Sequence, residues 1–231
     1  QVYTGGADWT ASSNSWPTAY ADRSDHKLHV KVCDLAGNCV NNQTNPAAST
    51  ISQLFQYDVN RPTAAVTTPQ NGQDQRALAV LSGTSADAAP GGIRRVYAAV
   101  EHTGGAGPQP PGWWNWGSGG FTLGSAGPYE PNPSPAWTQV SSTTLWDQLT
   151  LAWSTPVPAG MFVSSNTYRV AVMAIDVAGN LQPNPDGAGV GSYFRFDTQA
   201  PLARSTAPAN VAYVNQAALT SLAGTAIDAV P

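Results

Sequence analysis

Charged side chains are scarce in this chain. Only 10% of its 231 residues are Asp, Glu, Lys or Arg, against about 25% in an ordinary soluble domain. The ten Lys and Arg residues are spread along the sequence and the net charge is -4. A nucleic-acid partner is therefore not expected, because phosphate binding needs clustered basic residues. Glu, Lys and Leu are also few, whereas 22 Gly and 19 Pro are present, so we expect almost no helix.

Long hydrophobic runs and histidines are scarce too. No apolar run approaches the length of a membrane span and no signal peptide is visible, which fits a processed or truncated secreted protein. Only His26, His29 and His102 are present, without a Gly-x-Ser-x-Gly elbow, a phosphate-binding loop or a carboxylate pair in a recognisable context. We therefore expect no catalytic residues and no enzymatic activity.

What the sequence does contain is a segment that occurs twice, at residues 32–39 and 174–181. In both copies an alternating apolar run reaches the pattern Asp-x-Ala-Gly-Asn, which predicts a hairpin turn. Asp can bond to the backbone two residues on, Gly accepts positive φ, and Asn tolerates the left-handed region. The predicted turn residues are Asp34, Gly37, Asn38, Asp176, Gly179 and Asn180.

Other segments recur at nearly the same offset. Residues 55–62 match 194–201, an offset of 139, and residues 81–87 match 222–228, an offset of 141. A repeat of roughly 140 residues follows. Residues 1–59 are then the C-terminal part of one unit, 60–199 a complete unit and 200–231 the N-terminal part of the next. The predicted boundary residues are Asp58, Pro62, Asp197 and Pro201.

The last partial unit stops before the strand that follows Pro90 in the complete unit. Two interpretations are open. The chain is a window on a longer repeat protein, which we favour, or its incomplete ends complete each other between neighbouring copies.

Short alternating segments predict the strands. Residues 27–33 and 167–175 are the best examples, with apolar residues on one face at period two. Further strands are expected at 64–67, 78–81, 92–100, 137–140, 148–153 and 193–196. Strands of this length between Pro and Gly turns indicate an all-β sandwich. Residues 103–135 are dense in Gly, Pro and aromatics and predict a long ordered excursion.

The order of these motifs resembles the tandem bacterial immunoglobulin-like repeats of large secreted and cell-surface proteins. That resemblance implies an all-β fold of immunoglobulin-like β-sandwich repeats that act as rigid spacers in adhesins and filaments. The unit is longer than the roughly 100 residues of an immunoglobulin domain, which puts the role of the excursion in doubt. The resemblance also implies a tyrosine corner at Tyr168, whose counterpart His26 would then be structural.

In some members of that family calcium rigidifies the joints between units. Asp58 and Asp197 mark the boundaries and are natural oxygen ligands, and Asp34, Asp176, Asp87 and Asp228 lie in or near turns. Calcium needs six to eight oxygen ligands, and acidic residues are thinly spread here. We expect turn caps and no cofactor, with calcium at the unit joints as the alternative.

Cys33 and Cys39 flank the first predicted turn and face each other across it. Residues opposed in a hairpin are close enough for a disulfide, which we predict; a reduced, packed pair is the alternative. Closing so small a loop would contribute at most about 2 kcal/mol.

Trp113, Trp114 and Trp116 lie in the excursion. They would either cover the sandwich or a neighbouring subunit, or form a platform for sugar rings. We predict a secreted, non-enzymatic structural repeat of a stalk, sheath or filament, with adhesion as a further role. Its expected partners are itself or neighbouring repeats, and a surface glycan in addition. The alternative is a carbohydrate-binding accessory module.

Overall fold

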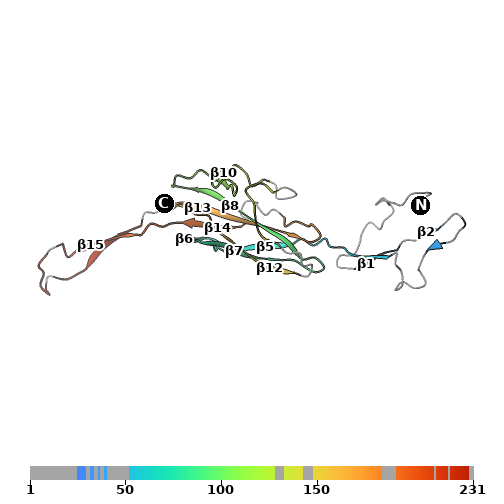
Figure 1. Cartoon of the computed structure of the whole chain (residues 1–231). Helices are drawn as coiled ribbons and strands as arrows, with labels where there is room; N and C mark the ends of the chain where they lie inside the picture. The colour runs from blue at the N-terminus through green and yellow to red at the C-terminus, as the bar shows by residue number, and fades with distance from the viewer. Residues whose placement is uncertain are drawn as a thin grey trace.

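The structure is a computed structural model and describes residues 25–29, 32–33, 36, 39–40, 52–127, 133–142, 148–183, 191–210, 212–217 and 219–228. Every regular element among these residues is a β-strand, as the composition predicts. None of them forms a helix long and apolar enough to cross a membrane. Figure 1 shows a central body of packed strands, with β1 beyond one end and β15 beyond the other.

The first of the two central sheets has three strands. Its order is β12 (Thr150–Pro156), β7 (Val80–Ala86) and β5 (Thr63–Thr68), all antiparallel. Its residues alternate between exposed and buried or half-buried along each strand. One face is therefore in the core and the other is exposed, as expected of an antiparallel sheet.

The second central sheet has seven strands. Its path runs through β10 (Phe121–Leu123), β9 (Gly112–Trp114), β8 (Ile93–Gly105), β13 (Asn166–Asp176), β14 (Ser192–Phe196) and β6 (Gln73–Gln75), while β11 (Thr138–Ser142) also pairs with β8. All pairs are antiparallel except β14 with β6, which is parallel.

The two sheets enclose the main core. Leu81 and Trp153 come from the three-stranded sheet, and Val100, Tyr168 and Val170 from the seven-stranded one. All are buried in one cluster with the rings of Phe162 and Phe194. Large aromatic and branched side chains of two facing sheets fill such a core. The arrangement is consistent with a β-sandwich.

A second apolar cluster lies on the opposite face of the seven-stranded sheet. Tyr97, Ala171 and Met173 project from β8 and β13 and pack with Trp113 and Trp137. Because the excursion supplies this cover, β13 is buried along both faces. The simple alternation expected for residues 167–175 is therefore incomplete, since the outward residues Ala171, Met173 and Ile175 are also apolar and covered.

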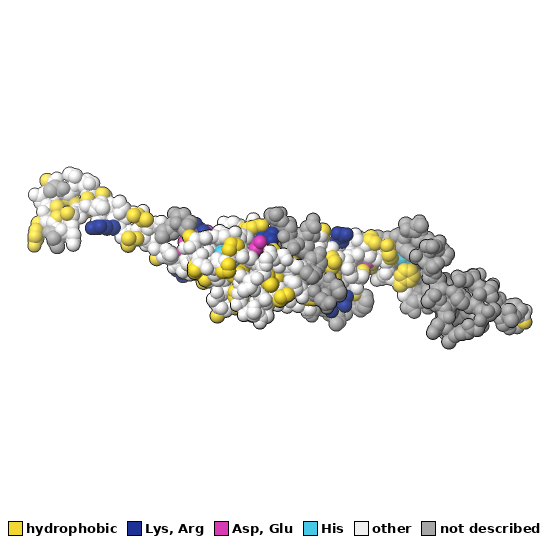
Figure 2. All heavy atoms as spheres, turned by 90° about the horizontal axis from the view of Figure 1, so that it is seen from above, with side chains coloured by type: hydrophobic (Ala, Val, Ile, Leu, Met, Phe, Trp, Pro, Cys, Tyr) yellow, Lys and Arg dark blue, Asp and Glu magenta, His cyan; other side chains and the backbone are white. Residues whose placement is uncertain are grey.

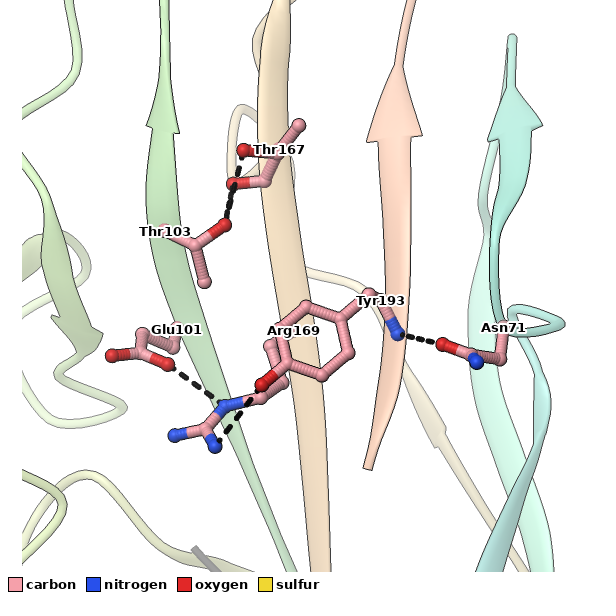
Figure 3. Close-up of polar contacts among 6 residues, drawn as sticks. All are labelled: Asn71, Glu101, Thr103, Thr167, Arg169 and Tyr193. Carbon is pink, nitrogen blue, oxygen red and sulfur yellow. Dashed lines mark hydrogen bonds and ion pairs between the residues drawn. The ribbon is translucent and has the colours of Figure 1, made fainter. Parts of the chain in front are cut away.

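The same face holds one buried charge. Arg169 is 4% exposed, its Nε lies 2.8 Å from Glu101 Oε2, and its guanidinium lies 4.8 Å from the centre of the Trp113 ring. Figure 3 shows Arg169 between Glu101 of β8 and Tyr193 of β14. A buried cation is tolerated when it is paired in this way.

Tyr168 provides the expected corner. Its hydroxyl accepts a hydrogen bond from the N–H of Val163 at 2.9 Å and donates one to Gln109 Oε1. His26 stacks on Phe55 with ring centres 5.3 Å apart, as Tyr168 stacks on Phe194 at 5.6 Å. The hydroxyl therefore bonds back to the chain, and His26 occupies a packing position.

Three further strand pairs lie outside the central sandwich. β1 (Asp25–His29) pairs with β4 (Ser52–Gln56), and β2 (Val32–Cys33) pairs with β3 (Cys39–Val40). β15 (Leu202–Ala207) pairs with β16 (Ala223–Ile227) at the other end. Figure 2 shows hydrophobic side chains on the surface at this end. On the face in view, the charged side chains of the described residues stand apart rather than forming one large patch.

Candidate metal centre

Three aspartates meet at the end of the sandwich where the chain enters it. Asp58 lies just before β5, Asp87 directly follows β7, and Asp176 is the last residue of β13. One carboxylate oxygen from each lies within 4.8 Å of the other two. Three separate segments of the chain therefore direct acidic groups at one point.

Local backbone bonds hold two of these side chains. Asp58 Oδ1 accepts a hydrogen bond from the N–H of Asn60 at 3.0 Å, which is the turn cap that the sequence predicts. Asp87 Oδ1 accepts one from Ala88 N–H at 2.8 Å. The N–H of Asp87 in turn donates to the carbonyl of Leu149 at 2.8 Å. In each carboxylate, Oδ1 is engaged in the local turn.

Asp176 is fully buried and is held by the Ala-Gly-Asn loop. Its Oδ1 accepts the N–H of Asn180 at 2.7 Å, and its Oδ2 accepts the Asn180 side-chain amide at 2.8 Å. The same amide donates to the carbonyl of Asp58 at 3.1 Å. Gly179 has φ of 95°, as predicted for this turn. Asn180 thus connects the loop to the incoming segment through its side-chain amide. From the sequence alone, this residue is explained by its tolerance of the left-handed backbone conformation.

Gly91 leaves the space between the carboxylates open. A methyl group on Gly91 would overlap the Oδ2 atoms of both Asp58 and Asp87. Asp87 Oδ2 is buried and accepts no hydrogen bond. A buried carboxylate oxygen without a donor is costly unless a proton or a cation satisfies it.

The electrostatics of the cluster point the same way. Burial raises the pKa of Asp87 above its usual value, and the negative charges of Asp176 and Asp58 raise it further, against the lowering effect of the Ala88 N–H. Neighbouring negative charges disfavour the ionised form of a carboxyl group. A divalent cation would remove that repulsion and satisfy Asp87 Oδ2.

The donor set fits calcium. Calcium takes carboxylate and carbonyl oxygens in a flexible arrangement and completes its shell with water, whereas magnesium demands near-ideal octahedral geometry. Asp58, Asp87 and Asp176 would hold the ion through oxygen atoms alone. The cluster contains no His, and a site made of oxygen ligands alone suits a hard cation such as calcium.

The remaining boundary and turn residues are placed as follows. Pro62 is buried, whereas Pro201 is exposed. Asp197 Oδ1 accepts the N–H of Gln199 at 2.9 Å, the counterpart of the Asp58 turn. Asp34, Gly37 and Asn38 lie outside the described residues.

The cysteine prediction is only partly within the described residues. The backbone of Cys33 pairs directly with that of Cys39 across β2 and β3, as Ile175 pairs with Leu181 across the equivalent loop. The side chains of both cysteines lie outside the described part, so the disulfide stays a prediction.

The three tryptophans of the excursion face inward to different degrees. Trp113 is 5% exposed in the outer cluster, and Trp114 is 7% exposed in the main core. Trp116 is half-buried, and its indole N–H donates to the carbonyl of Ala136 at 3.0 Å. These positions favour the interpretation that the tryptophans cover the sandwich. Trp113 and Trp114 present no ring face for stacking on a sugar.

His102 also has a packing environment. Its Nδ1 lies 2.8 Å from the carbonyl oxygen of Pro110, and its Nε2 lies 3.0 Å from that of Gly104. Both ring nitrogens therefore face the backbone at the start of the excursion.

The sequence places all three aspartates at a unit boundary or a turn. It does not show that they meet, because they are 29 and 89 positions apart (58 to 87, 87 to 176). One signal was present. Asp58 and Asp87 recur as Asp197 and Asp228, at offsets of 139 and 141. No protein-family model matches this chain, and no curated protein is detectably similar to it in sequence.

Proposed function

We propose that this chain is a non-catalytic structural part of an extracellular surface protein, built from tandem immunoglobulin-like units whose joints bind calcium. The observation that carries the proposal is the meeting of Asp58 with Asp87 and Asp176. Asp58 belongs to the segment that connects β4 to the sandwich, whereas the other two belong to the sandwich itself. An ion held by all three would fasten the connection to the domain.

The strand registers support tandem units. In the C-terminal hairpin Ala203 pairs with Ala226 and Arg204 with Thr225. In the sandwich the residues 139 and 141 positions earlier form the same pairs, Ala64 with Ser85 and Ala65 with Thr84. Both ladders also have a register shift at the equivalent position, between Val66 and Thr68 in the sandwich and between Ser205 and Ala207 in the hairpin.

The N-terminal pair supports the same organisation. His26 pairs with Phe55 in β1 and β4, and Tyr168 pairs with Phe194 in β13 and β14. The offsets are 142 and 139, as in the sequence repeats. On this proposal, strands from the end of one unit precede the sandwich and strands from the start of another follow it.

Calcium would act on this arrangement by neutralising the three carboxylates. Without it, repulsion between the groups opposes close docking of the incoming segment. With it, Asp58 would be held against Asp87 and Asp176, and Asn180 would keep its bond to the Asp58 carbonyl. Since Pro62 already restricts the backbone, little rotation would remain at the joint. Such joints suit a stalk or filament that must stay extended.

Calcium titration tests the proposal. Calorimetric titration of the metal-free chain should show binding, and thermal unfolding should occur at a higher temperature with calcium than with chelator. At a calcium concentration of 100 times Kd the expected stabilisation is about 2.7 kcal/mol. Asp87→Asn should abolish both effects, because it removes the carboxylate whose Oδ2 has no other partner.

A matched control is Asp228→Asn, which changes the counterpart of Asp87 in the exposed hairpin. This variant should respond to calcium as the parent chain does. The proposal is wrong if calcium leaves the unfolding temperature of the parent unchanged, or if Asp87→Asn retains the full response.

A further inference from the structure

The first and last parts of the sandwich are joined directly by one strand pair. The chain enters through residues 58–62 into β5, continues into β6, and leaves from β14 towards β15. β6 and β14 pair in parallel, with Gln73, Asp74 and Gln75 opposite Phe194, Arg195 and Phe196. Figure 1 shows β1 and β15 on opposite sides of the body. Tension along the chain would therefore act on these two strands from opposite ends.

Parallel pairing decides how such tension is resisted. A pull on the entering chain draws β6 towards its N-terminal end, and a pull on the leaving chain draws β14 towards its C-terminal end. In a parallel pair these directions are opposite, so the strands must slide past each other. Sliding loads all of the evenly spaced hydrogen bonds of the ladder together. A pull on neighbouring ends would instead break the bonds one after another.

Bonds beyond the ladder reinforce this pair at both ends. At one end the N–H of Gly72 donates to the Tyr193 carbonyl at 2.7 Å, and the N–H of Tyr193 donates to Asn71 Oδ1 at 2.8 Å (Figure 3). At the other end the N–H of Asp197 donates to the Gln75 carbonyl at 2.9 Å. Backbone bonds therefore extend the pairing past both ends of β6.

A bidentate ion pair crosses the middle of the ladder. Arg195 Nε lies 3.0 Å from Asp74 Oδ1, and Arg195 Nη2 lies 2.7 Å from Asp74 Oδ2. Both side chains are partly exposed, so the pair adds little to equilibrium stability. Its fork geometry nevertheless fixes the relative position of the two strands along their axis. Sliding by one residue would break both contacts.

From this geometry we propose that the β6–β14 pair, with the Asp74–Arg195 ion pair across it, is a mechanical clamp against tension along the chain. The inference rests on the proposed function, since only an extended surface protein would experience such tension. β5 shares the load through its antiparallel pairing with β7. The β6–β14 ladder connects the entry side of the sandwich to its exit strand through backbone pairing.

Single-molecule force spectroscopy of the full chain tests the clamp through the direction of pulling. Handles attached at Val59 and Thr198 pull β6 and β14 in opposite directions. Handles at Arg76 and Thr198 pull on the two adjacent C-terminal ends and peel the strands apart. The first geometry should require a severalfold higher unfolding force. Equal forces in the two geometries would overturn the proposal.

A double variant tests the ion pair. D74A/R195A should shorten the lifetime at constant force about tenfold in the Val59 and Thr198 geometry, with a much smaller change in the peeling geometry. The matched control is T103A/T167A, which removes an exposed side-chain contact of 3.0 Å between β8 and β13 and should leave the lifetime unchanged. An unchanged lifetime in D74A/R195A would contradict the role of the ion pair.

All pulling is done in chelator, so the result does not depend on calcium. If calcium does not bind but the unfolding force depends on the pulling direction, the calcium-binding joint is rejected and the mechanical clamp is supported. If calcium binds but the two pulling geometries require equal forces, the joint is supported and the clamp is rejected.

Discussion

The central sandwich and the C-terminal hairpin present nearly the same strands in two different environments. β5 and β7 share their register with β15 and β16, residue for residue, including the position of the irregularity. Yet Leu81 of β7 is 0% exposed, whereas its counterpart Leu222, immediately before β16, is 78% exposed. Likewise, Pro62 is buried and Pro201 is exposed. Strand pairing therefore follows from the local sequence, and burial follows from the second sheet.

Leu81 offers the largest expected contrast between the two regions. Leu81→Ala removes a side chain from the core formed with Trp153, Tyr168 and Val170. It should destabilise the sandwich by about 2–5 kcal/mol, the usual cost of such a cavity. Leu222→Ala at the exposed counterpart should stay within about 0.5 kcal/mol. Urea denaturation followed by tryptophan fluorescence measures both, and equal losses would show that the hairpin is also covered in solution.

A second contrast concerns two equivalent glycines. A methyl group on Gly83 would overlap the carbonyl oxygen of Ala65 and the ring of Trp153. On Gly224 the three atoms nearest to it would be backbone atoms of Arg204 and Ser205 in the opposing strand. Gly83→Ala should therefore cost about 1–3 kcal/mol through overpacking. Gly224→Ala should leave the global unfolding transition unchanged, because no indole closes over it.

The same denaturation experiment separates the two glycine variants. A Gly83→Ala chain as stable as the parent would mean that Trp153 moves away at little cost. The sandwich and the C-terminal hairpin would then differ in burial but not in how tightly the glycine position is packed.

The strands of both regions could be predicted because their information is local. Alternation and turn residues correctly indicate β5, β8, β12, β13 and β14. The strand expected at 78–81 instead begins at Val80 and extends to Ala86, because its pairing with β5 and β12 sets its length. β6, β9 and β10 are too short to carry a periodic pattern.

The outer cluster and the aspartate site could not be predicted, because both depend on long-range packing. No period in residues 103–137 indicates that Trp113 and Trp137 pack in one cluster with Met173. Asp87 and Asp176 each look like a turn residue in isolation. Only the pairing of β8 with β13 and of β7 with β5 places them beside Asp58. The residue types therefore predict the turns, whereas the strand topology brings the three aspartates together.

The aspartate cluster should also give the sandwich a pH-dependent stability that the hairpin lacks, and this is the smallest of the expected effects. The pKa of Asp87 is raised in the folded chain, so the folded state binds this proton more tightly than the unfolded state. Its contribution to stability is greatest at acidic pH and is lost as the pH rises through the folded pKa. Metal-free chain should therefore show a small rise in Tm on acidification from neutral pH, relative to the Asp87→Asn variant.

Calcium should reverse that trend, because protons compete with the ion for the same carboxylates. In saturating calcium the Tm should fall on acidification. Asp87→Asn should flatten both trends, since the variant neither titrates at that position nor completes the ion's oxygen shell. Asp228→Asn in the hairpin should preserve both. If the metal-free parent and Asp87→Asn show identical pH profiles, the three aspartates are turn caps and the two regions differ in packing only.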